Sequence, residues 1–104
     1  METICQEADR ITHGDRKTDY GHPSVSFAEI AKLWSVYLGV SVTPEQVAMC
    51  QVLVKMVRLR HTPGHRDSLV DISGYCNCAG MILDKKTPPA SDEELYKQVF
   101  GDQT

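Results

Sequence analysis

The chain has 104 residues, of which 41% are hydrophobic, and a formal net charge of −3. Its length fits one domain with a modest core, and its acidic balance argues against a general nucleic-acid binder, whose phosphate contacts need a basic face. No apolar stretch reaches membrane-spanning length, and charges occupy the first ten residues, where a signal peptide would be apolar. We therefore expect a soluble, cytoplasmic protein with neither a membrane nor a nucleic-acid partner.

The four cysteines lack the paired Cys-x-x-Cys spacing of a zinc site. Cys76 and Cys78 lie within an apolar run of small residues. A free thiol in such surroundings behaves as a small hydrophobic side chain. We expect the cysteines to be reduced and to lie in the core.

The first half of the chain predicts two helices joined by a loop. Apolar residues recur every third or fourth position in residues 3–12, which predicts a short helix. Residues 13–23, HGDRKTDYGHP, contain two glycines and a proline and predict a loop. A second apolar stripe in residues 24–39 predicts a helix that Ser26 caps and Gly39 ends.

The clearest helix start lies at Thr43. A proline follows at the first helical position, and Gln46 can reach back to Thr43 in a capping box. The helix after this cap is apolar nearly all round, so we expect it to be the central, buried element. Its polar stripe consists of Gln51, Lys55 and Arg58.

The second half begins with a turn at residues 61–64, HTPG. Residues 66–83 predict a helix with many small residues, which indicates the close approach of a neighbouring helix. After a linker, Ser91 opens a last amphipathic helix. We thus predict a small all-α bundle of four to five helices, with the bundle domain in residues 1–84 and the linker and short C-terminal amphipathic helix in residues 85–104.

A local basic run lies in residues 55–71, KMVRLRHTPGHRDSLVD. In an acidic chain such a run indicates a place that meets an anion, and its side chains suit charge-assisted hydrogen bonds to phosphate. The alternative is a helix C-terminus whose cations suit the helix dipole. The residues predicted to bind a nucleotide are Arg16, Lys17, Tyr20, His22, Lys55, Arg58, His61, His65 and Arg66.

Two carboxylates come after the basic run. Asp67 and Asp71 are four residues apart, so a helix would place them on one face, one turn from each other. Two carboxylates so placed can bind Mg²⁺. The alternative is that Asp67 complements the dipole at the helix start while Asp71 is a solvated surface acid.

Several stretches resemble known families. GDRKTDYGHP, FAEIAKLWSVYLG, VTPEQVA and HRDSLVDISGY together resemble an uncharacterised family of small phage and prophage proteins. DSLVDISGYCNCA also resembles the second acidic helix of the MazG-like, all-α nucleotide pyrophosphohydrolases. That resemblance implies a MazG-like bundle in which Asp67 and Asp71 hold Mg²⁺ with Glu29 from an earlier helix. The earlier helix of those enzymes offers two glutamates one turn apart. Here Glu29 is the only acidic residue in the corresponding predicted helix, residues 24–39.

Many phosphate donors beside few metal ligands favour binding over hydrolysis. The leading hypothesis is a phage-type, homo-oligomeric protein that holds a phosphate-rich nucleotide and sequesters a nucleotide immune signal of the host. One alternative is an enzyme, a Mg²⁺-dependent MazG-like nucleoside triphosphate pyrophosphohydrolase. Another is a protein-binding inhibitor module that uses the terminal helix around Leu95 and Val99. An oligomer is expected because the glycine- and cysteine-rich helix and the amphipathic tail can bury their faces against other copies.

Overall fold

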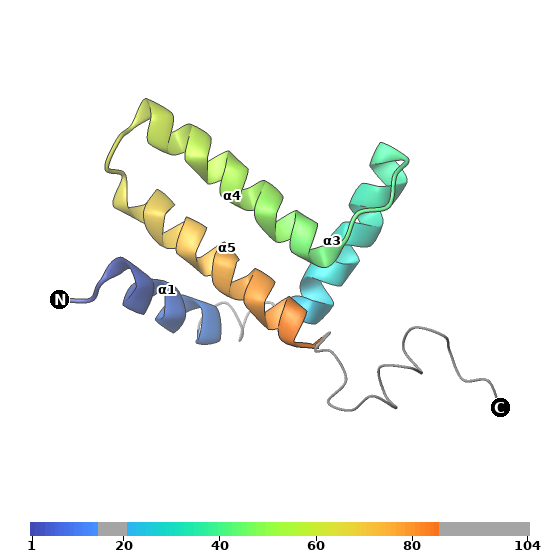
Figure 1. The fold of residues 1–104 in the computed structure, drawn as a ribbon, viewed down its shortest axis with the longest axis horizontal. Helices are drawn as coiled ribbons and strands as arrows, with labels where there is room; N and C mark the ends of the chain where they lie inside the picture. Colours follow the sequence, from blue (N-terminus) through green and yellow to red (C-terminus); the bar gives the residue numbers. More distant parts are fainter. Residues whose placement is uncertain (15–20, 86–104) are drawn as a thin grey trace, which may run out of the picture.

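The computed structural model describes residues 1–14 and 21–85, which form four helices and no strand (Figure 1). The all-α fold predicted from the sequence is confirmed. The helix expected from Ser91 and the linker before it lie outside the described residues. The helices are α1 (Ile4–His13), α3 (Pro23–Leu38), α4 (Pro44–His61) and α5 (Arg66–Lys85).

Local capping signals define the start of α4 and the end of α3. The Thr43 side chain accepts a hydrogen bond from the Gln46 backbone N–H at 3.2 Å, and the Gln46 side chain accepts one from the Thr43 N–H at 2.9 Å. Gly39 closes α3 with a φ of 71°, a left-handed conformation that glycine adopts without strain. Both predictions are therefore confirmed.

The start of α3 differs from the prediction. The helix begins at Pro23, and the residue that caps it is His22, whose Nδ1 accepts a hydrogen bond from the Ser24 N–H at 3.1 Å. Proline suits the first helical position because its missing N–H would have no partner there. Ser26 thus lies inside α3, and His22, predicted to bind a ligand, has a structural role.

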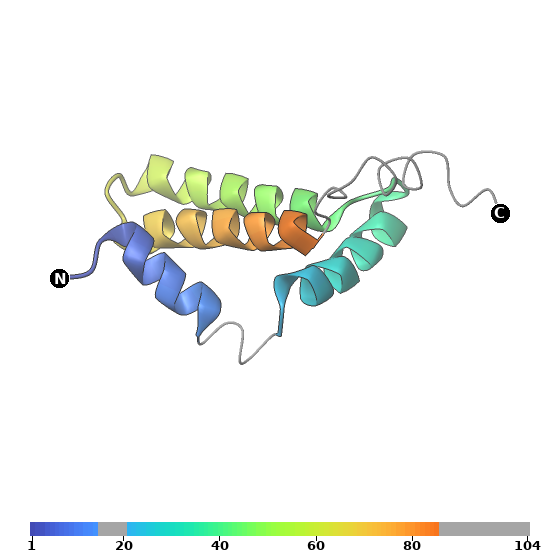
Figure 2. The same cartoon turned by 60° about the horizontal axis from the view of Figure 1, so that its bottom comes forward.

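The central element is α5 rather than α4. The α5 helix contacts each of the other described helices, forming an antiparallel hairpin with α4, while α1 lies against it and α3 crosses near the start of α4 (Figures 1 and 2). The core lies where α3, the first turns of α4 and the last turns of α5 meet. Its buried residues are Phe27, Ala31, Val47, Ala48, Cys78, Ala79 and Ile82.

The prediction that α4 is buried is wrong for this chain. Only Val47 and Ala48 of α4 are buried, because α1 lies on the far side of the hairpin against α5 and leaves much of α4 uncovered. Within the described ranges, no helix is both long and apolar enough to cross a membrane. The large apolar side chains of α4 that are exposed are Met49, Leu53, Val54, Met56 and Val57.

Of the two glycines of α5, only one serves a close helix contact. A Cβ on Gly74 would lie 3.7 Å from Oγ1 of the buried Thr12, so α1 packs closely there, whereas a Cβ on Gly80 would meet nothing within 4 Å. All four cysteines are free thiols. The prediction that they lie in the core holds only for Cys78, since Cys5 and Cys76 are exposed and Cys50 is half-buried.

Candidate functional site

The basic and the acidic half of the run at residues 55–71 meet in an ion pair. The turn after α4 folds α5 back along it, and Nζ of Lys55 lies 3.0 Å from a carboxylate oxygen of Asp71. The Lys55 side chain is only 16% exposed, against 43% for Asp71. Lys55, expected on a polar outer stripe, therefore faces the neighbouring helix, and its charge is used within the fold.

The carboxylates predicted to hold Mg²⁺ do not gather in one chain. Asp67 and Asp71 lie one turn apart on α5 as predicted, and Glu29 is exposed on α3. The described part of the chain contains no group of three or more His, Cys, Asp or Glu side chains that could hold a metal ion. A Mg²⁺ ion at Asp71 would also compete with the Lys55 ammonium.

Arg66 connects α5 to the start of α1. Its guanidinium donates to the backbone oxygen of Glu2 at 3.1 Å and lies 3.7 Å from the Glu7 carboxylate. The pKa of Glu2 is lowered because Arg10 donates hydrogen bonds to its carboxylate and because Arg10 and Arg66 are positively charged. Arg66 was predicted to bind a ligand, but the contacts it makes are between helices.

Three of the predicted donors, Arg58, His61 and His65, lie together at the α4–α5 turn. Here a hollow of about 300 Å³ opens, and none of its lining residues is acidic. Arg58 forms no ion pair with a carboxylate of residues 1–14 or 21–85. The hollow is lined by Val57, Arg58, His61, Thr62 and His65.

His65 is held in one orientation by the first turn of α5. Its Nδ1 accepts a hydrogen bond from the N–H of the buried Ser68 at 3.3 Å, and Oγ of Ser68 lies 2.7 Å from the same nitrogen. When Nδ1 accepts, the neutral ring carries its proton on Nε2, which is then a hydrogen-bond donor. Ser68 was not predicted from the sequence, because histidine is not among the residues that ordinarily mark a helix N-cap and no local signal indicates the contact.

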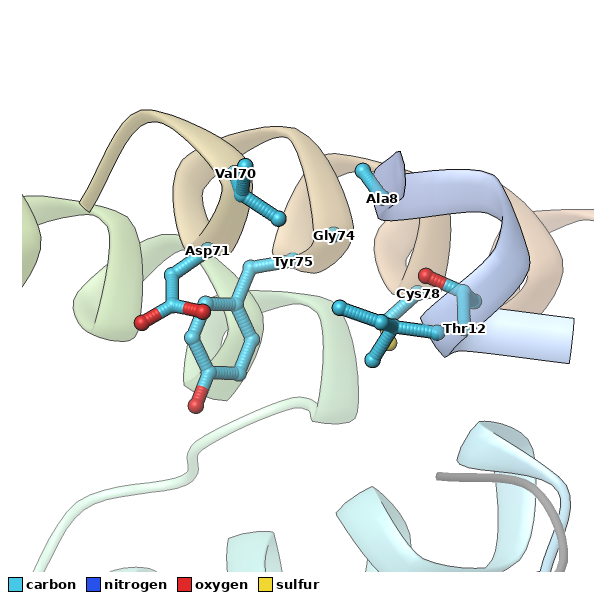
Figure 3. Close-up of a pocket in the computed structure, with 8 residues that line it drawn as sticks. Ala8, Thr12, Val70, Asp71, Gly74, Tyr75 and Cys78 are labelled. Carbon is cyan, nitrogen blue, oxygen red and sulfur yellow. The ribbon is translucent and has the colours of Figure 1, made fainter. Parts of the chain in front are cut away.

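A small cavity lies on another side of α5, between this helix and α1 (Figure 3). Its volume of about 50 Å³ corresponds to about one or two water molecules, too little for a nucleotide. Asp71 and Tyr75 come from successive turns of α5 here, and Thr12 comes from α1 (Figure 3). Asp71 therefore lines this cavity and also pairs with Lys55 of α4.

The remaining predicted nucleotide-binding residues and one large aromatic side chain belong to other parts of the sequence. Arg16, Lys17 and Tyr20, predicted to bind a nucleotide, lie outside the described residues. Trp34, an aromatic side chain that could otherwise stack on a base, is half-buried and packs against the core.

The comparison with protein families decides where this chain belongs. A family described as a domain of unknown function (DUF6378) matches residues 3–83. The chain belongs to this family. The DUF6378 match covers α1, α3, α4 and most of α5, and so includes the hollow and the ion pair.

Two curated phage proteins are similar to this DUF6378 chain. The Gene 55 protein of Mycobacterium phage D29 is 40% identical over 84 residues, which are 81% of this chain and 56% of the phage protein. The Gene 55 protein of Mycobacterium phage L5 is 37% identical over 95 residues, which are 90% of this chain and 57% of the phage protein. The chain thus spans little more than half the length of these relatives. No solved structure matches it significantly.

Proposed function

We propose that this DUF6378 protein binds the phosphate groups of a nucleotide in the hollow at the α4–α5 turn. The observation that carries the proposal is that Arg58, His61 and His65 line one hollow that has no acidic residue in its lining. Guanidinium and imidazole N–H groups form charge-assisted hydrogen bonds with phosphate oxygens. In the host cytoplasm, such binding would sequester a nucleotide signal, in keeping with the phage relatives.

Binding without hydrolysis is the form of the proposal that the contacts support. Asp71 is paired with Lys55, and the described residues provide no three-ligand metal group. Hydrolysis of a phosphoanhydride by a MazG-like route would need Mg²⁺ to be held by several carboxylates. The second part of the proposal is that the protein acts as a homo-oligomer. Another copy would then cover the open side of the hollow.

The experiment is calorimetric titration of the full chain with nucleoside mono-, di- and triphosphates, cyclic dinucleotides and ADP-ribose, each with and without Mg²⁺. After denaturation of the protein, the ligand is recovered and identified. We expect binding of at least one nucleotide and its recovery unchanged. If no member of the panel binds, the proposal is wrong, and if pyrophosphate or a cleaved product is recovered, the protein is an enzyme.

A matched pair of variants separates a ligand site from cations that merely suit the helix dipole. Arg58 and Arg60 are both exposed in the last turn of α4, but only Arg58 lines the hollow. Loss of one charge-assisted contact corresponds to a roughly tenfold to hundredfold weaker Kd, so Arg58→Ala should weaken binding by this factor. Arg60→Ala should bind nearly as wild type. An equal loss in both variants would indicate general electrostatic attraction instead of a site in the hollow.

A further inference from the structure

An open apolar groove separates α3 from α4. The C-terminal end of α3 leads away from the α4–α5 hairpin (Figures 1 and 2), and we call its residues 33–38 the α3 arm. The groove between this arm and α4 has a volume of about 370 Å³, and most of its lining side chains are apolar. The apolar lining includes Trp34, Leu38, Val40, Met49, Cys50 and Leu53.

The α3 arm also exposes apolar side chains. Val36 and Tyr37 are 83% and 88% exposed, and Leu33 lies one turn before Tyr37 and is exposed as well. Residues at this spacing share one face of a helix. The arm therefore has an apolar face with no cover from residues 1–14 or 21–85.

The exposed apolar surface continues along α4. Leu53 lines the groove and is 60% exposed, and Met56 and Val57 lie three and four residues after it. Val57 in turn lines the hollow of the candidate phosphate site. One uncovered strip thus runs from the groove to that hollow.

Charge is almost absent from this surface. Between Leu33 and Val57, the sequence contains only two charged residues, Glu45 and Lys55. Lys55 is turned away toward Asp71, on the side of α4 that contacts α5. Depletion of charge distinguishes the centre of a protein interface from ordinary surface.

The size of this surface suits an interface between two copies. The exposed apolar side chains of the arm and of α4 present on the order of 500 Å² of apolar surface, if a fully exposed side chain contributes about 100 Å². A standard interface buries about 800 Å² per partner, of which about two-thirds is apolar in homodimers. The amount available therefore matches what one half of a stable homodimer needs.

We propose that a second copy of the chain covers this surface, with the α3 arm of each copy packed against the groove and α4 of the other. An apolar element that projects from a partner would fill the groove. The α3 arm of a second copy is such an element. In a two-fold arrangement each copy provides one arm and one groove, so both faces are covered and the assembly closes. This dimer rests on the homo-oligomer part of the proposed function and specifies the faces that meet. It is tested without a ligand, so its failure is distinguishable from a failure of nucleotide binding.

The first test measures the mass of the full chain by sedimentation. Wild type should be a dimer or a closed assembly of dimers, and Leu53→Glu should be monomeric because a carboxylate would be placed in an apolar contact. The matched control is Leu83→Glu, since Leu83 is an exposed leucine of similar exposure (52%) on α5 that does not line the groove. It should assemble as wild type. A monomeric wild type, or equal dissociation by both variants, would overturn the proposal.

The second test identifies what covers the groove. Cys50 lines it, whereas Cys5 and Cys76 are exposed elsewhere. If a second copy is the cover, maleimide labelling of Cys50 should slow severalfold as protein concentration rises, while labelling of the other two cysteines stays constant. Protection of Cys50 that is independent of concentration would show that residues of the same chain cover the groove. Retained helical circular dichroism in Leu53→Glu, which alters an exposed side chain, excludes unfolding as the cause of dissociation.

Discussion

Lys55 illustrates how a distant residue determines the role of a side chain. As part of a basic run it suits an anion, but the fold places Asp71 3.0 Å from its ammonium. Because the Lys55 side chain is mostly buried, the charge would be costly there without this carboxylate. The pair thus stabilises the contact between α4 and α5 and removes Lys55 from the set of free phosphate donors.

Replacement of Asp71 tests this role. Asp71→Asn should lower the free energy of unfolding by about 1–2 kcal/mol, between the values for exposed and buried pairs, because Lys55 would lose its counter-ion. Urea denaturation followed by circular dichroism measures the change. Asp67→Asn is the matched control on the same helix, and it should cost less, about 0.3–1 kcal/mol, because the exposed Asp67 loses only its interaction with the helix dipole. A cost as large as that of Asp71→Asn would mean that the pair adds nothing specific.

At the scale of the helices, the ends with clear capping residues could be predicted, whereas the start of α3 and the covered faces could not. The capping box at Thr43 and the end of α3 at Gly39 depend on residues within one turn, which the sequence contains side by side. Which face of α4 is covered depends on where α5 and α1 lie, and no local pattern contains this information. For the same reason α4 was expected to be the centre, although α5 occupies that place.

A comparison of Gly39 with Gly80 tests whether the left-handed conformation at the end of α3 requires glycine. Neither Gly39 nor Gly80 has an atom within 4 Å of where a Cβ would be, but Gly39 has a φ of 71° and Gly80 lies within α5. Gly39→Ala should therefore destabilise the protein by about 1–2 kcal/mol, because a Cβ is strained in the left-handed region. Gly80→Ala should stabilise it by about 0.5–1 kcal/mol, since alanine favours a helix.

Thermal or urea unfolding of both variants measures these changes. If Gly80→Ala destabilised the protein as much as Gly39→Ala is expected to, the predicted difference between the two sites would be wrong. Such a destabilisation would indicate that the exposed backbone at Gly80 is in contact with another copy of the chain, as the small residues of this helix first suggested.

For the whole molecule, the candidate site was predicted in part. Arg58, His61 and His65 were selected from their residue types around one turn, and the hairpin of α4 and α5 brings them to one hollow. Arg66 and His22 were selected by the same reasoning but serve contacts within the fold. Arg66 donates to the backbone of Glu2 and lies beside the Glu7 carboxylate, whereas His22 accepts a hydrogen bond from the Ser24 N–H at the start of α3. Composition identifies donors, and only the fold shows which of them are already engaged.

If two copies share the α3–α4 surface, the stability of the whole molecule depends on its concentration. Association of folded chains stabilises them by mass action, so Tm should rise with protein concentration for wild type and for Leu83→Glu. For Leu53→Glu, Tm should be lower and constant, because its folded state is a monomer. Scanning calorimetry over a hundredfold range of concentration measures this, and ligand is absent, so the result is independent of nucleotide binding. A constant Tm for wild type, combined with a monomeric mass, would mean that a second copy does not cover the apolar surface of α4.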